Sequence, residues 1–171
     1  MDFTDVIQTR RSHRKFNEDK VPEDVLKRIF DATILAPTWS NKQGVRYIVV
    51  DKPEQKEKVA EAGQKWLKNA PMIIVAYINP KNSGINTNQL PYFTVDVAIS
   101  LHQFILAATN EGLGTCWIGF FDEEKTKKVL NLPDNERIIG MTPLGYSKYV
   151  PREVKRQTIE DMVFHNEYGK K

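Results

Sequence analysis

The stretch FTVDVAISLHQFILAATNEGLGTCWI, residues 93–118, is the part of this 171-residue chain that most strongly limits its possible folds. From Phe93 to Glu111, apolar residues occur on almost every side of the helix that their spacing predicts, which is typical of a helix buried by its own domain or by a partner. Gly112 and Gly114 end that helix, and Thr115 to Ile118 are predicted to form a buried strand. The stretch therefore predicts a central helix followed at once by a strand.

Further strands and helices are predicted on both sides of this stretch. β-Branched and aromatic residues predict strands at residues 46–51, 72–78 and 137–146, the last interrupted by Pro143. Spacing and helix-start residues predict a short helix from residue 3 to the basic run at Arg10, and helices over 22–36, 53–62, 122–130 and 158–164.

Strands that alternate with helices in this way are typical of an α+β fold, an α/β sandwich in which a central mixed β-sheet is covered by helices. Residues 79–91 have no periodic pattern and form a candidate lid. No repeat, low-complexity tract or linker divides the chain, so residues 1–171 are expected to form a single domain.

Composition excludes several classes of function. The net charge is only +3, from 25 Lys and Arg against 22 Asp and Glu, which gives no overall electrostatic case for binding nucleic acid. The longest apolar stretch, residues 72–78, is too short to span a membrane. The start of the chain lacks the pattern of a secretory signal, and the single cysteine, Cys116, cannot form a disulfide within one chain. We expect a cytoplasmic protein.

The common catalytic motifs are missing from the sequence. It contains no Gly-x-Gly-x-x-Gly turn, no phosphate-binding loop with Gly-Lys-Ser/Thr, and no Gly-x-Ser-x-Gly elbow. His13, His102 and His165 lie far apart and lack zinc-ligand spacing, so no metal site is predicted. Cys116 lies in an apolar strand, where a thiol is usually inert packing. The dinucleotide-fold, P-loop and hydrolase interpretations therefore lose support, and Cys116 is not expected to be a nucleophile.

Four local features are candidates for ligand binding. Arg10, Arg11, Ser12 and Arg14 form a basic run whose guanidinium groups can hold a phosphate, although such a run can equally be a solvated patch. The other three features are the polar segment from Ala36 to Gln43, which can also be a simple turn, the strand end Cys116 to Asp122 with Gly119 inside it, and the basic group from Arg152 to Arg156.

The order of these features resembles the flavin-dependent nitroreductase family. RRSHRKF at residues 10–16 is similar to the family's opening Arg-Arg-Ser-x-Arg-x-Phe signature. Residues 36–50 are similar to its Ala-Pro-Ser-x-x-Asn-x-Gln-Pro-Trp-x-Phe-x-Val-Val segment. Further similarities follow in the family's order at Ala70-Pro71, Trp117 to Gly119, Leu132-Pro133, Leu144 to Tyr146 and Arg156 to Val163, so the resemblance covers almost the whole chain.

The resemblance implies an FMN site at a homodimer interface. Arg10, Ser12 and Arg14 would hold the FMN phosphate, joined by Arg11 and by Arg156 from the tail. The resemblance assigns the remaining contacts to Thr38, Asn41 and Gln43, which would line the flavin from the other subunit or touch its ribityl chain and ring edge, to main-chain groups of Ile118, Gly119 and Phe120, and more loosely to Gln64. Gly44-Val45, Phe120 and Ser147 depart from the family pattern, and the first two are expected to change the substrate pocket.

The implied function is that of an oxidoreductase in which NADH or NADPH reduces FMN before a nitroaromatic, quinone or related small acceptor reacts, in a ping-pong mechanism. The cofactor would carry the chemistry, which agrees with a sequence that has no catalytic triad or metal cluster. Alternatives within the same fold are a flavin-dependent dehalogenase or enone reductase. A non-catalytic FMN-binding protein, and an interaction module whose basic run binds an acidic partner, are alternatives of other classes.

Overall fold

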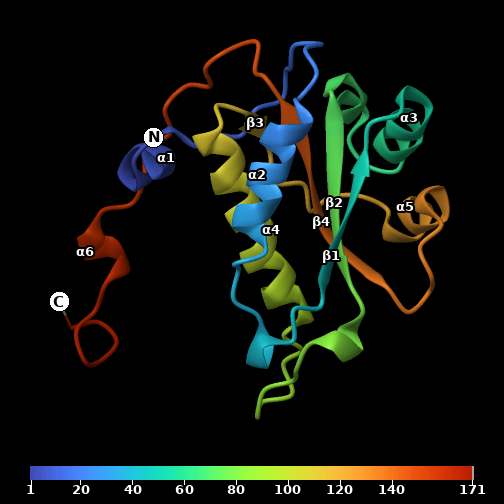
Figure 1. Ribbon diagram of the computed structural model, residues 1–171. Coiled ribbons are helices and arrows are strands. Elements are labelled where there is room, and N and C mark those ends of the chain that lie inside the picture. The colour runs from blue at the N-terminus through green and yellow to red at the C-terminus, as the bar shows by residue number, and fades with distance from the viewer. Residues whose placement is uncertain (171) are drawn as a thin grey trace.

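The computed structural model describes residues 1–170 and has a four-stranded sheet between two layers of helices (Figure 1). The strands are β1 (Val45–Val50), β2 (Met72–Ile78), β3 (Gly114–Thr115) and β4 (Arg137–Gly145), in the spatial order β1-β2-β4-β3. These strands and the helices around them confirm the predicted α+β sandwich.

The four strands pair antiparallel throughout, so the expected mixed sheet is wrong in this respect. Within residues 1–170, parallel pairing is limited to one isolated bridge between Ser12 and Thr115. The direction of β2 follows from the connection before it, in which α3 (Pro53–Glu61) and the 3-10 helix η2 (Lys65–Asn69) pack against each other. This doubling back returns the chain to the end of the sheet where β1 stops, so the next strand runs antiparallel.

The predicted strand from Thr115 to Ile118 is shorter than expected, because β3 stops at Thr115. The register that pairs Thr115 with Leu144 continues to an isolated bridge between Ile118 and Met141 and places Cys116 opposite Pro143. Pro143 has no N–H to donate to the ladder, so the regular pairing is interrupted at this position. The Cys116 amide donates to the Thr142 hydroxyl at 3.1 Å.

Helices cover both faces of the sheet. On one face lie α2 (Glu23–Thr33) and α4 (Phe93–Asn110), and on the other lie α3 and α5 (Glu123–Leu130) (Figure 1). The side chains of β2 alternate between the two cores: Ile74, Ala76 and Ile78 pack with α4, whereas Ile73 and Val75 pack with the second layer. The prediction of a central helix is confirmed by α4, whose Val97, Leu101 and Phe104 are fully buried.

The terminal segments lie to one side of this sandwich. The first helix, α1 (Phe3–Thr9), contacts α4, and the last, α6 (Ile159–Met162), lies away from the sheet (Figure 1). Every residue from 152 to 170 is exposed, including apolar Ile159, Met162 and Tyr168. No helix within residues 1–170 is both long enough and apolar enough to cross a membrane.

Two further 3-10 helices were not predicted from the sequence. They are η1 (Trp39–Asn41), in the polar loop before β1, and η3 (Pro80–Asn82), at the start of the aperiodic segment 79–91. An isolated bridge between Ile85 and Pro91 brings the two ends of residues 85–91 together and makes this part of the segment a closed loop.

Candidate functional site

Five arginines line one pocket of about 500 Å³ at the edge of the sheet. We call it the arginine pocket. Its walls contain no acidic side chain and are formed by Arg10, Arg11, Ser12, Arg14, Tyr149, Pro151, Arg152, Val154 and Arg156. The structure therefore brings the predicted basic run together with the predicted tail arginine, although more than 140 residues of chain separate them.

The basic run is held in place by the sheet. The His13 amide donates to the Thr115 carbonyl at 2.7 Å, and a bridge joins Ser12 to the same residue. A second bridge joins Phe16 to Ser147, and the Phe16 ring is buried. The run from Arg10 to Phe16 thus lies along β3 and the end of β4, which fixes its backbone at one wall of the pocket.

Positive charge in the arginine pocket lacks compensation. Burial lowers the pKa of Arg10 below its ordinary value, and the neighbouring charges of Arg156 and Arg11 lower that pKa further. Arg11 has a partly structural role, since its Nη1 donates to the carbonyls of Gln8 and Arg10 at the end of α1. A bound anion would relieve this repulsion, and guanidinium forks suit a phosphate.

The segment after β3 forms a second part of the site. Its first residue, Cys116, is within electrostatic range of the arginine pocket, because it contributes to the pKa of Arg10 and raises it. The Ile118 amide and carbonyl are both bonded to Met141, at 2.9 and 3.0 Å, which leaves the exposed Gly119 and Phe120 as the main-chain groups open to a ligand.

Gln64 lies close to this segment. The Asp122 amide donates to the Ala62 carbonyl at 2.6 Å, and a Cβ on Gly63 would lie 3.0 Å from the Phe121 side chain. Gln64 follows directly as the N-cap residue of η2. The structure thus brings Gln64 together with the predicted residues Gly119 and Phe120.

Thr38, Asn41 and Gln43 form a separate group in the loop before β1. The Gln43 amide donates to the Thr38 hydroxyl at 2.9 Å, and Gln43 Nε2 donates to Asn41 Oδ1 at 3.1 Å. The backbone of this loop is tightly wound, with positive φ angles of 46°, 55° and 50° at Ser40, Asn41 and Gln43. Such angles are costly for residues other than glycine and persist only where surrounding contacts enforce them.

A buried carboxylate that sequence reasoning missed supplies those contacts. Asp96, only 1% exposed, accepts from the Trp39 amide at 2.8 Å and from the Ser83 hydroxyl at 2.6 Å. The Trp39 ring packs edge-on to Tyr92, and a Cβ at Gly84 would collide with that ring at 2.1 Å. The available signal was the single acidic residue in a mostly apolar helix.

One chain does not bring the two polar groups together. The loop with Thr38 is attached at Asp96, near the start of α4, whereas the basic run is attached at Thr115, just beyond the end of α4. The 18 residues of α4 span about 27 Å at the rise of an α-helix. The two groups therefore lie at opposite ends of the central helix (Figure 1).

Comparison with known proteins identifies the family. The family model described as "Nitroreductase family" matches residues 7–63 and 58–146. The chain belongs to the nitroreductase family. A nitroreductase family protein of Clostridium novyi NT is 34% identical, with a TM-score of 0.82, over 99% of this chain and 96% of its own.

Two further relatives carry more specific names. An Archaeoglobus fulgidus protein provisionally named NADH dehydrogenase/NAD(P)H nitroreductase is 32% identical over 152 residues, which are 84% of each chain. A structure titled FMN-dependent nitroreductase, from Clostridium difficile R20291, is 25% identical, with a TM-score of 0.80, over 97% of this chain and 100% of its own.

In this nitroreductase family member, Ser147 has a structural role. Its hydroxyl donates to the Tyr149 carbonyl at 2.6 Å and so accepts a hydrogen bond from His13 Nδ1, which lies 2.7 Å away. Burial, and then the charge of Arg10, lower the pKa of His13 below its ordinary value. The imidazole is therefore neutral at pH 7 and joins the basic run to the chain that enters the tail.

Asp96→Ala is expected to loosen the loop with Thr38. Without the carboxylate, the Trp39 amide and the Ser83 hydroxyl lose their acceptor, at a cost of about 1–3 kcal/mol in the free energy of unfolding. Urea denaturation measures that loss, and hydrogen exchange at the Trp39 amide locates it. Asp96→Asn keeps an acceptor oxygen, so an equal loss in both variants would contradict this account.

The lowered pKa of His13 predicts that acid destabilises the fold. The unfolded chain takes up a proton at His13 near pH 6.5, while the folded chain takes one up only at lower pH, so stability is complete above about pH 6.5 and falls below it. Thermal unfolding between pH 7.5 and 5.5 measures this slope. His13→Asn should reduce the slope without abolishing it, because the pKa of His102 is lowered too. An unchanged slope in the variant would contradict the assignment.

Proposed function

We propose that this chain is an FMN-dependent oxidoreductase that uses NADH or NADPH to reduce a nitroaromatic, quinone or related small acceptor. The observation that carries the proposal is the arginine pocket, in which five arginines lie with no acidic side chain in the walls. Membership of the nitroreductase family and the names of its relatives support the same activity.

The residues present fit FMN. In the proposed site, Arg10, Arg14 and Arg156 hold the phosphate through charge-assisted hydrogen bonds, and the Ser12 hydroxyl adds a further donor. Gly119 lets the backbone approach a flat ring closely, since it has no Cβ. Phe120, which is 82% exposed, offers apolar surface beside that ring, and Gln64 offers an amide from the start of η2.

The chemistry that FMN supplies when bound is the transfer of reducing equivalents from NADH or NADPH to an oxidised acceptor. The side chains of this chain bind, orient and stabilise negative charge, and none has to act as acid or base. Arg14 is suited to that electrostatic role because it lies at the mouth of the arginine pocket and is exposed. We propose that donor and acceptor occupy the same open site in turn, which is the ping-pong order.

A homodimer completes the proposed site. The loop that contains Thr38, Asn41 and Gln43 is attached at the end of α4 opposite the arginine pocket. It cannot reach the arginine pocket of its own chain, so a partner chain would supply these residues. A stripe of exposed or half-buried residues at helical spacing runs along α4 and is suited to that contact, namely Val95, Ile99, His102 and Leu106. The exposed apolar residues of α1 and of the tail add surface that a second copy would cover.

Arg14→Ala is expected to weaken FMN binding by about 1.5–3 kcal/mol, because it removes a charge-assisted contact to the phosphate. Quenching of flavin fluorescence on titration with protein measures the affinity. Arg137→Ala is the matched control, since it removes the same charge at the start of β4, the opposite end of the strand from the pocket. Equal affinities for the Arg14 and Arg137 variants would remove Arg14 from the site.

The dimer is tested by sedimentation at micromolar concentration, where we expect a species of twice the 19.7 kDa chain mass. Truncation after Val150 removes the exposed tail and with it Arg156, and it should shift the equilibrium toward monomer and weaken FMN binding together. A 19.7 kDa species alone in the full-length protein would contradict the shared site.

A further inference from the structure

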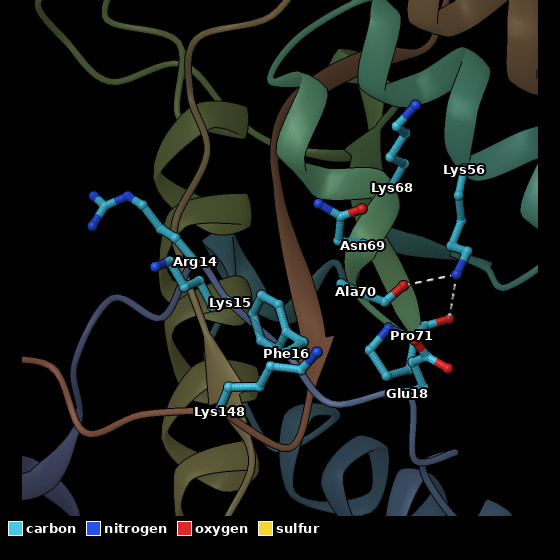
Figure 2. Close-up of a pocket in the computed structure, with 10 residues that line it drawn as sticks. All are labelled: Arg14, Lys15, Phe16, Glu18, Lys56, Lys68, Asn69, Ala70, Pro71 and Lys148. Atoms are coloured by element: carbon cyan, nitrogen blue, oxygen red, sulfur yellow. Dashed lines mark hydrogen bonds between the residues drawn. The ribbon is translucent and has the colours of Figure 1, made fainter.

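A second basic pocket, of about 600 Å³, shares Arg14 with the arginine pocket. Figure 2 shows the residues that line it. We call it the lysine pocket. It contains four lysines and one arginine against a single acid, and its walls are Arg14, Lys15, Phe16, Glu18, Lys56, Lys68, Asn69, Ala70, Pro71 and Lys148. Nothing in the proposed FMN contacts uses its lysines.

The walls of the lysine pocket come from separate parts of the chain (Figure 2). Lys15 lies in the segment that pairs with the end of β4, and the Lys148 amide donates to the Lys15 carbonyl at 3.1 Å, which keeps these two lysines together. The end of η2 forms the facing wall with Lys68 and Asn69. Lys56 reaches in from α3.

The cations of the pocket differ in how they are engaged. Lys56 Nζ donates to the carbonyls of Ala70 and Pro71, at 2.7 and 3.3 Å (Figure 2). Lys68 pairs with Glu57 at 2.8 Å. Within residues 1–170, Lys15 and Lys148 have no ion pair and no side-chain hydrogen bond in this structure. These two ammonium groups are therefore free to meet a ligand, while Lys56 and Lys68 add fixed positive charge to the walls.

Arg14 connects the lysine pocket to the proposed function, because it lines both pockets. In the proposed function, the phosphate of the bound FMN occupies the arginine pocket. The dinucleotide donor must bring its nicotinamide to the same open site, and its own phosphate groups then need a different positive surface nearby.

Arginine and lysine differ as phosphate ligands in a way that matches the two roles, a cofactor that stays bound and a donor that leaves. Arginine forks grip a phosphate with two parallel bonds, which suits a cofactor that stays bound, whereas lysine is a mobile, strongly hydrated point charge. A donor that leaves in every turnover is better served by such exchangeable contacts. We propose that the lysine pocket binds the phosphate groups of the nicotinamide dinucleotide donor, an inference that rests on the proposed function.

NADPH should gain more from this pocket than NADH does. Both donors carry a pyrophosphate, and NADPH adds a phosphate monoester with a charge of about −1.5 to −2 at pH 7. Four lysines and Arg14 against Glu18 leave the pocket with surplus positive charge for that group. We therefore expect a preference for NADPH that weakens as salt is added, because salt screens exposed charges.

The test is the double variant Lys15→Glu with Lys148→Glu. Its matched control is Lys58→Glu with Lys128→Glu, which makes the same change in net charge at exposed lysines of α3 and α5, outside the lysine pocket. The apparent affinities for NADPH and NADH come from the rate of anaerobic flavin bleaching at increasing donor concentration. Calorimetry on FMN-loaded protein measures the affinity for adenosine 2′,5′-bisphosphate, a probe that has no nicotinamide.

We expect the pocket variant to bind NADPH and the bisphosphate at least about tenfold more weakly than the control, because two attractive charges become repulsive. Affinity for FMN should stay that of the wild type. Weakening confined to NADPH and the bisphosphate would assign the pocket to the 2′-phosphate, and equal weakening of NADH would assign it to the pyrophosphate.

Equal affinities for NADPH in the pocket variant and its control would overturn the inference. That outcome leaves the proposed function standing, provided that NADPH still bleaches the bound flavin of both variants. The reverse result is also distinguishable: if neither donor bleaches the flavin of the wild type, the proposed function fails. Failure of the wild type to bind the bisphosphate in calorimetry likewise overturns the inference, whatever the outcome for activity.

Discussion

The length of α4 is the constraint on which the rest of this structure depends. Its apolar residues form the core between α2 and the sheet, and its two ends hold the two polar parts of the candidate site. Asp96 at one end anchors the loop with Thr38, and the chain just beyond the other end pairs with the basic run. A rigid spacer of this kind keeps the two parts separate in one chain. In the proposed homodimer, the loop of one chain would meet the basic run of the other.

Electrostatics divides the basic residues into two pockets with different properties. The arginine pocket is built from chain ends that meet at β3, where repulsion among close guanidinium groups favours a bound anion. In the lysine pocket, Lys56 is held by backbone carbonyls and Lys68 is paired with Glu57, while Lys15 and Lys148 are exposed. This division is consistent with one phosphate that is retained and others that exchange, and Arg14 is the side chain common to both.

Much of the fold could be predicted from local patterns. The strand at 72–78 and the central helix have boundaries that agree with the prediction to within one residue, because their apolar runs are long and end at clear breaks. Strand direction was not predictable, since it depends on how α3 packs against η2. The shortening of β3 depends on Pro143 lying across from Cys116, and such a pairing is not visible from either residue alone.

The candidate site was predictable as a set of residues but not as an arrangement. The motifs identified the basic run and the tail arginine Arg156, and the structure shows that both line one pocket. The buried acceptor Asp96 escaped notice because a single acidic residue in a mostly apolar helix carries no repeating signal. The lysine pocket escaped for a related reason, since Lys15, Lys56 and Lys148 come from three separate segments that only the fold brings together.

The most direct test of the central claim is the absorbance spectrum of the purified protein, recorded anaerobically with FMN present and then after addition of NADH or NADPH. The account predicts flavin bands that shift on binding to the protein, bleach when the donor is added, and return when menadione or a nitroarene follows. A protein that does not bind FMN, or that binds FMN whose bands stay unchanged with both donors, would contradict it.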